Sequence, residues 1–325
     1  MKTTDQNLWH PPLLGDWCAA VDLEPEPLFI LEDFIPTDAA VLMSGTAKVS
    51  YKTWLAFLMC QAVASGKTLY GIEPKVSGPV LIIEQEGPRK QTRNRWKFLE
   101  NGQGGVSITG LPIYFAHREG LQLDKPEHLQ KLVNFVKQEG VVLTVIDTLA
   151  KSHNGDENST RDVSNAMTHI DTIRKANRGS SVLFLHHLRK ETMDPNTDID
   201  ADVRGSSALV GFYDTHIALR KKKKNQSYIE LTVRASDEEE KQYHVSWYIT
   251  KQLARAEVTI ERVDPNSIAD SVKIEAATKL LPGQTYTYRQ LEDMWGFDRD
   301  RTKLLADILK EDGVLLQAGR TFCLA

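Results

Sequence analysis

The stretch that decides the fold reads Ser44-Gly45-Thr46-Ala47-Lys48-Val49-Ser50-Tyr51-Lys52-Thr53. The apolar run at residues 40–44 predicts a strand, and the pattern of residues 53–65 predicts a helix. A glycine-led loop between a strand and a helix, closed by Lys and a hydroxyl residue, is typical of a phosphate-binding loop, because backbone amides and the positive helix end face the anion. The alternative is a basic strand-to-helix turn.

The loop departs from the usual pattern in length and in composition. Lys52 follows Gly45 by seven positions, whereas the pattern places the lysine about six positions after the first glycine. Ser50 and Tyr51 stand where a second glycine is usual. The loop alone therefore leaves both interpretations open.

Outward from this loop, short apolar runs alternate with helical patterns. The expected strands are residues 79–84, 113–115, 141–146 and 181–187, and the expected helices are residues 88–101, 126–139 and 160–176. Such alternation is typical of an α/β fold, a mostly parallel sheet covered by crossover helices. After Asp214 the period changes to two, which predicts antiparallel edge strands at residues 216–219, 228–233 and 243–249.

A turn-rich stretch at residues 263–267 divides the chain. Beyond it we expect helices at residues 268–281, 288–295 and 299–312 and a strand pair at 314–316 and 321–324. Three helices closing on a small hairpin is the layout of a winged helix-turn-helix domain. We therefore expect an N-terminal extension over residues 1–26, an α/β core over 27–263 and a winged helix over 264–325.

Composition excludes several classes of protein. The 325 residues are enough for two domains. The longest apolar run falls short of the roughly 20 residues that cross a bilayer, so we expect no membrane association. Three scattered cysteines favour a reducing cytoplasm. The net charge of −4 means that local basic patches must hold any nucleic acid.

Three acidic residues follow apolar strands. Asp147 ends one of them and is suited to Mg²⁺, or else it caps a helix or lies in a surface turn. Glu84 and Glu86 follow another, where a carboxylate could activate water, and strand alternation puts both on one side. His186 and His187 end a further strand; each is a packed core histidine or a phosphate sensor.

Five segments together resemble the RepA-type hexameric helicases of the RecA superfamily, over about residues 27 to 250. The segments are Gly45 to Thr53, Glu86-Gly87-Pro88, Ile146 to Leu149 with His153 and Asp156-Glu157-Asn158, Leu185-His186-His187, and Arg204 to Leu209. The resemblance implies a RecA-like P-loop ATPase core over residues 27–263. It also implies ATP and Mg²⁺ as ligands, single-stranded DNA as a partner and a hexameric ring.

The resemblance assigns roles to particular residues. Lys52 contacts the β- and γ-phosphates, Thr53 and Asp147 hold Mg²⁺, Glu86 rather than Glu84 is the general base, and His187 senses the γ-phosphate. The phosphate loop further comprises Gly45, Lys48, Ser50 and Tyr51. Bulk at Ser50 and Tyr51 weakens the expectation of fast turnover. The DNA-facing segment comprises Arg204, Gly205, Ser206 and Ser207.

Other basic residues are candidates by position. Arg234 could complete a neighbouring subunit's site, with an ordinary edge-strand arginine as the alternative. The C-terminal candidates for duplex DNA are Arg299, Arg301, Lys303 and Arg320. Residues 263–325 carry a net charge of −2, so a winged helix that binds protein is an equal alternative.

The leading hypothesis is an ATP-dependent DNA helicase or single-stranded DNA translocase in the replication of a plasmid, phage or other mobile element. The alternative is a nucleotide-switched DNA-binding regulator or loader without motor activity.

Overall fold

The computed structural model describes residues 13–22, 28–46, 49–102, 104–156, 158–187, 198–200, 203, 207–221, 227–236, 238–263, 270–297 and 299–324. Its contacts divide the chain into two compact units, Met1–Glu261 and Arg262–Ala325. The sequence placed the boundary two residues later, between residues 263 and 264. No helix in the ranges just given is long and apolar enough to cross a bilayer.

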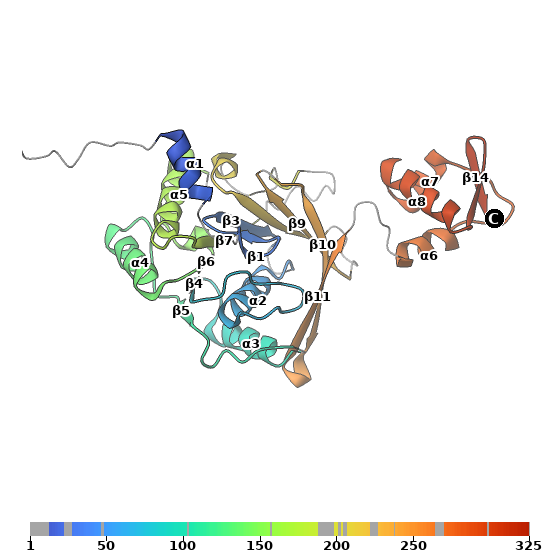
Figure 1. Ribbon diagram of the computed structural model, residues 1–325. Helices are drawn as coiled ribbons and strands as arrows, with labels where there is room; N and C mark the ends of the chain where they lie inside the picture. Colours follow the sequence, from blue (N-terminus) through green and yellow to red (C-terminus); the bar gives the residue numbers. More distant parts are fainter. Residues whose placement is uncertain are drawn as a thin grey trace, which may run out of the picture. The chain divides into compact units, whose positions relative to one another are not determined.

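The first unit is built on a nine-stranded sheet with the order β11-β10-β9-β8-β3-β7-β6-β4-β5 (Figure 1). Its parallel strands are β3 (Ala40–Gly45), β4 (Val80–Glu84), β5 (Ile113–His117), β6 (Leu143–Asp147), β7 (Ser181–His187) and β8 (Thr215–Arg220). The remaining strands are β9 (Ile229–Ala235), β10 (Lys241–Thr250) and β11 (Arg255–Val263). The predicted α/β fold with a mostly parallel sheet is confirmed.

Two details of the predicted sheet edge are wrong. The first strand after Asp214, β8, pairs with β3 in parallel and only then with β9 in antiparallel fashion. The sequence analysis also missed β11, although Ala256 and Val258 alternate with more exposed neighbours and are buried. Alternation of buried and exposed residues shows that a segment is extended. It does not show whether the neighbouring strand runs parallel or antiparallel to it.

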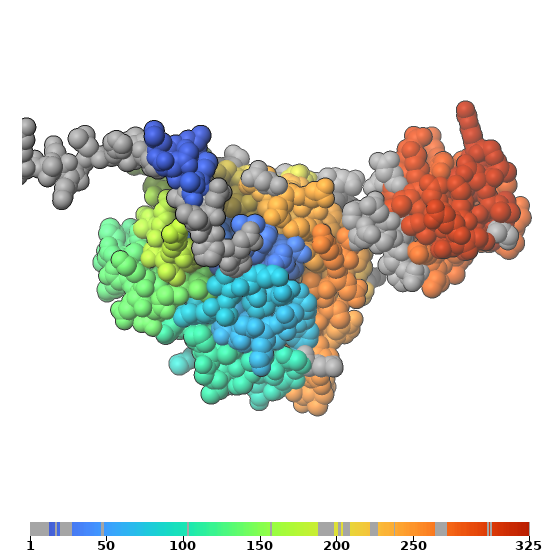
Figure 2. Space-filling model, in the orientation of Figure 1, coloured from blue at the N-terminus to red at the C-terminus, as the bar shows by residue number. Residues whose placement is uncertain are grey.

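Helices cover both faces of the sheet. Helices α2 (Lys52–Ser65) and α3 (Arg89–Glu100) pack on the face that receives Val41 and Met43. Helices α4 (Pro126–Glu139) and α5 (Thr160–Arg174) pack on the face that receives Leu42. The central strands are therefore buried on both faces and largely apolar, with polar residues such as Ser44, Glu84 and Asp147 at or near their carboxyl ends. In Figure 2 the segment from α2 to α3, light blue to teal, forms the lower central part of the visible surface of this unit.

Short elements complete the first unit. They are α1 (Leu14–Asp22), β1 (Phe29–Leu31), β2 (Ile35–Pro36) and the 3₁₀ turns η1 (Leu149–Lys151), η2 (Ser207–Gly211) and η3 (Lys251–Leu253).

The second unit contains α6 (Asp270–Thr278), β12 (Tyr286–Thr287), α7 (Tyr288–Trp295), α8 (Arg299–Glu311), β13 (Leu315–Ala318) and β14 (Thr321–Leu324). A capping box between Thr287 and Gln290 starts α7, since each side chain accepts a hydrogen bond from the other residue's amide. Leu291, Leu305 and Phe322 are fully buried in its own core. The three helices and the hairpin lie where the sequence predicts them, and α6 ends at Thr278, three residues earlier than predicted.

Candidate nucleotide site

Four parallel strands end at one cavity of about 590 Å³. Gly45 ends β3, Glu84 ends β4, Asp147 ends β6 and His187 ends β7. This is the edge at which open α/β sheets bind ligands. The cavity is lined by Ser50, Tyr51, Lys52, Thr53, Trp54, Glu84, Glu86, Gly87, Pro88, Gln91, Arg95, Asp147 and His187.

Lys52 is the first residue of α2, and its side chain is buried at the head of that helix. Its ammonium donates to the Gly45 carbonyl at 2.5 Å, so the lysine spans the loop that it closes. Burial lowers the pKa of Lys52 to about 8, although Asp147 and Glu86 favour its charged form. A buried cation beside two carboxylates at the head of a helix is suited to attract a phosphate.

Gly45 and Tyr51 explain how the longer loop is accommodated. A Cβ at Gly45 would lie 2.7 Å from Ser50 Oγ, so only glycine allows the loop to fold back this closely. Tyr51 has a φ of 56°, the left-handed region that glycine adopts without strain. Its ring stacks on Trp247, with centroids 5.7 Å apart and planes 14° apart. Stacking therefore holds a tyrosine in a glycine conformation.

Thr53 and Asp147 form a pair of oxygen ligands. The Thr53 hydroxyl donates to Asp147 Oδ2 at 2.7 Å. Burial raises the pKa of Asp147 to about 6, despite the hydrogen bond from Thr53. A hydroxyl and a carboxylate are hard oxygen ligands of the kind that Mg²⁺ takes together with nucleotide phosphates. The described residues contain no cluster of three or more His, Cys, Asp or Glu suited to a metal, so the nucleotide would have to supply the other ligands.

Glu84 and Glu86 have different surroundings, because β4 ends at Glu84 and strand alternation does not continue to Glu86. Glu84 is 1% exposed and accepts hydrogen bonds from the Glu86 amide at 3.1 Å and from the Gly87 amide. It also accepts from the Thr92 hydroxyl at 3.1 Å, and His117 Nε2 lies 3.1 Å from it. Glu84 is therefore fully engaged in holding the loop that follows it.

Glu86 instead faces the cavity with its side chain 48% exposed. Its carboxylate lies 3.6 Å from His187 Nε2, and this contact lowers the pKa of Glu86 against the opposing effect of burial. An ionised, accessible carboxylate can accept a proton from water. Of the adjacent histidines, His186 is buried in the sheet and His187 lines the cavity.

The sequence did not point to three residues that line the cavity, Trp54, Gln91 and Arg95, or to one buried series of hydrogen bonds. Gln91 and Arg95 lie one turn apart on α3, and their i, i+4 spacing was the available signal. Ser44 Oγ lies 2.7 Å from His216 Nε2, and His216 Nδ1 lies 2.7 Å from Asp200 Oδ1. Ser44 and His216 are fully buried, so this hydrogen-bonded series is not accessible to a substrate. It instead joins β3 to β8.

Arg234 lies on β9 and is held by carboxylates of its own chain. Its guanidinium donates to Asp198 at 3.0 Å, to Asp200 at 2.9 Å and to Glu240 at 2.9 Å. Burial by itself would raise the pKa of Asp200, but the hydrogen bonds from His216 and Tyr213 hold it well below its ordinary value. Arg234 therefore belongs to a network of charged side chains that adjoins the hydrogen-bonded series Ser44–His216–Asp200.

The remaining predicted residues are only partly placed. Lys48, Arg204, Gly205 and Ser206 lie outside the described residues, and of Ser207 only the backbone, at the start of η2, is described. In the second unit, Arg299, Arg301, Lys303 and Arg320 are exposed. Arg299 and Lys303 are four apart and share a face of α8, whereas Arg301 lies over the Phe297 ring at 5.3 Å. The three do not form one cluster.

The chain matches a known protein family and shares its fold with a solved structure. Residues 11–193 match the AAA_25 family, described as an AAA domain. A DnaB-like replicative helicase, solved for its interactions with primase, superposes with a TM-score of 0.52 at 13% identity. That match covers 68% of this chain and 57% of the helicase, so the chain spans little more than half of the helicase's length. A KaiC-like protein of the archaeon Pyrococcus horikoshii superposes with a TM-score of 0.45 at 13% identity, covering 71% of this chain and 93% of that one.

Proposed function

The chain belongs to the AAA_25 family of AAA domains, and from this we propose that it is an ATP hydrolase of the DNA helicase type. The proposal is carried by one observation: a single cavity gathers Lys52, the Thr53–Asp147 pair and the Glu86–His187 pair. These groups together match the needs of phosphoryl transfer to water, which are a cation, hard oxygen ligands and a base.

Each group has a role in the proposed reaction. Lys52 leaves the Gly45 carbonyl and contacts the β- and γ-phosphates, while the loop residues Gly45, Lys48, Ser50 and Tyr51 surround them. Thr53 and Asp147 hold Mg²⁺. When bound, Mg²⁺ neutralises charge on the phosphate oxygens.

Glu86 is proposed as the general base. It takes a proton from a water molecule whose oxygen attacks the γ-phosphorus, and the bond from that phosphorus to the bridging oxygen breaks. The position of Glu86 supports this role, because its carboxylate lines the cavity and is 48% exposed, and its lowered pKa leaves it unprotonated at neutral pH. His187, beside Glu86, is proposed to sense the γ-phosphate.

We propose single-stranded DNA as the substrate of the motor, a hexameric ring as the assembly and replication of a plasmid, phage or other mobile element as the setting. The fold shared with a replicative helicase supports the motor. The segment Arg204 to Ser207 is proposed to face the DNA. Arg234 is a weaker candidate for completing a neighbour's site, because three carboxylates of its own chain hold it.

The second unit is proposed to be a winged helix. Its order of elements, with a helix, a short strand, two helices and a hairpin, supports this. Arg299 and Lys303 on one face of α8, and Arg320 in the hairpin turn, are proposed to contact duplex DNA.

The alternative, a nucleotide-switched DNA-binding regulator or loader, is favoured by Tyr51. A tyrosine in a left-handed conformation, stacked on Trp247, fixes the end of the phosphate loop next to Lys52. A loop fixed at this end can bind nucleotide and yet align it poorly for turnover.

Steady-state ATP turnover with and without single-stranded oligonucleotide, at one salt concentration, separates these functions. A motor hydrolyses ATP faster with DNA and forms rings in particle images. A switch binds ATP, shows no stimulation and stays monomeric or dimeric. Absence of ATP binding would overturn both.

A further inference from the structure

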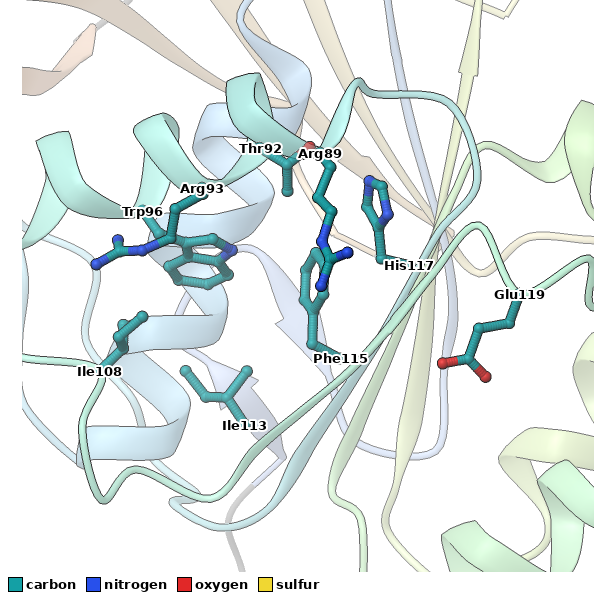
Figure 3. A pocket seen from close by; sticks show the side chains of 9 residues that line it. All are labelled: Arg89, Thr92, Arg93, Trp96, Ile108, Ile113, Phe115, His117 and Glu119. Atoms are coloured by element: carbon teal, nitrogen blue, oxygen red, sulfur yellow. The ribbon is translucent and has the colours of Figure 1, made fainter.

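A second cavity, of about 560 Å³, lies between α3 and the edge strand β5 (Figure 3). Its lining shares no residue with the nucleotide cavity. Helix α3 contributes Arg89, Thr92, Arg93 and Trp96, strand β5 contributes Ile113, Phe115 and His117, and Ile108 and Glu119 complete it. Neither the family nor the proposed reaction accounts for this cavity.

One part of the lining is a rigid aromatic wall. Trp96 is stacked on Phe57, with centroids 4.3 Å apart and planes 8° apart. Phe115 meets Trp96 edge-on at 6.3 Å and stacks on His117 at 6.2 Å. Rings that are fixed by one another present a preformed apolar surface, which favours a flat aromatic ligand.

The other part is cationic. Arg89 and Arg93 are four residues apart on α3 and are exposed, and the first turn of that helix contains no acidic residue. Arg89 makes no ion pair with any residue in the described ranges, and Arg93 reaches only Glu100, at 3.4 Å. Glu119 is the single acid of the lining. Figure 3 shows the guanidinium groups of Arg89 and Arg93 on opposite sides of the Trp96 ring, so each arginine is placed to contact a phosphate group separately.

The cavity also touches the support of the catalytic loop. Thr92 and His117 line the cavity, and both contact the Glu84 carboxylate at 3.1 Å. Glu84 holds the amides of Glu86 and Gly87. A ligand that moves Thr92 or His117 therefore moves the anchor of Glu86.

We propose that this cavity binds a nucleotide unit, with its base against the aromatic wall and its phosphate on Arg89 or Arg93, and that this binding adjusts Glu86 through Glu84. The unit comes either from single-stranded DNA or from a free mononucleotide, which share this chemistry. The effect on hydrolysis rests on the proposed role of Glu86, whereas the binding does not. An acidic peptide fits less well, because it would satisfy the arginines and leave the aromatic wall unused.

The binding test compares two double variants of the full chain. Arg89→Ala/Arg93→Ala removes the cavity cations, and Lys90→Ala/Lys97→Ala removes two exposed cations of the same helix outside the lining. With a labelled oligothymidylate at fixed salt, the arginine variant should bind about tenfold more weakly or worse. The lysine variant should lose less than about threefold. Equal losses in both variants would overturn the proposal.

Photocrosslinking locates the ligand. An oligonucleotide containing 5-iodouracil and free 5-iododeoxyuridine monophosphate are each irradiated with the protein, and the modified peptides are identified by mass spectrometry. Crosslinks to Trp96, Phe115 or His117 from the strand, or from the free nucleotide, support the proposal and identify the source. No crosslink between residues 89 and 119 from either reagent overturns it, leaving an acidic peptide as the ligand to test.

Turnover separates this proposal from the proposed function. The arginine variant should keep its basal ATP turnover and lose the stimulation by the ligand, since neither arginine lines the nucleotide cavity. If the parent protein hydrolyses no ATP, the proposed function fails, and binding and crosslinking still decide the cavity. If the arginine variant is stimulated like its parent, the link to Glu86 is wrong.

Discussion

Thr53 Oγ1 donates a hydrogen bond to Asp147 Oδ2 at 2.7 Å, although 94 residues separate them in the chain. The pair joins the first turn of α2 to the end of β6. We predict that Asp147→Asn raises the Mg²⁺ concentration needed for half-maximal ATP turnover by about 10- to 100-fold. Nucleotide binding in EDTA should persist, because Lys52 is intact. A magnesium titration of turnover that matches the parent would contradict the metal role.

Lys52 should make stability depend on pH. Burial lowers its pKa to about 8 from 10.5, so between these values the unfolded chain binds more protons and the free energy of unfolding rises with pH. Below pH 8 Lys52 is charged in both the folded and the unfolded protein, so the cost of burying its charge is fully present. Between pH 7.5 and 9.5 the gain should be on the order of 2 kcal/mol. Urea unfolding of the parent and of Lys52→Met over this pH range measures the gain. If the free energies of unfolding of the two proteins ran parallel with pH, Lys52 would be solvated.

The two glutamates should respond differently to the same change. Glu86→Gln should retain ATP and lose hydrolysis, because the amide cannot accept a proton, with stability within about 0.5 kcal/mol of the parent. Glu84→Gln should lower the free energy of unfolding by about 1 to 3 kcal/mol, since Glu84 is buried and several donors lose their carboxylate. Turnover assays and urea unfolding test both, and unchanged hydrolysis in Glu86→Gln would move the base to another residue.

The buried hydrogen-bonded series of Ser44, His216 and Asp200 should stabilise the fold and take no part in catalysis. Burial lowers the pKa of His216, so its neutral ring donates from Nδ1 to Asp200 and accepts at Nε2 from Ser44. His216→Ala deprives both Ser44 and Asp200 of this hydrogen-bond partner. It should lower the free energy of unfolding by about 2 to 4 kcal/mol. The exposed hydroxyl variant Thr168→Ala, as a control, should cost less than about 0.5 kcal/mol. Urea unfolding measures the loss of stability in both variants. Equal losses would mean that the Ser44–His216–Asp200 hydrogen bonds do not stabilise the fold.

Tyr51→Gly tests the loop. Glycine relieves a left-handed conformation that costs a residue with a Cβ about 1 to 2 kcal/mol, and it removes the stacking on Trp247. The two effects oppose each other, so the melting temperature should change little. Turnover should rise, because the loop amides gain freedom to align on the phosphates. Slower turnover in Tyr51→Gly would show that the aromatic ring positions the nucleotide.

The α/β core and most residues of the nucleotide cavity could be predicted from the residue pattern alone. Apolar runs that alternate with helical patterns leave little choice of architecture, because both faces of a parallel sheet must be covered. The carboxyl ends of parallel strands meet at one edge, so Asp147 and His187 were predictable neighbours of the phosphate loop.

Only the tertiary structure decided what depends on contacts between distant segments. Glu84 and Glu86 differ because the strand ends between them and because Thr92 and His117 reach Glu84 from α3 and β5. The direction of β8 depends on its neighbour, β3. Arg89 and Phe115 line one cavity only after α3 packs beside β5. Local sequence patterns carry periodicity, whereas pairing, burial and ionisation depend on which residues the fold brings together.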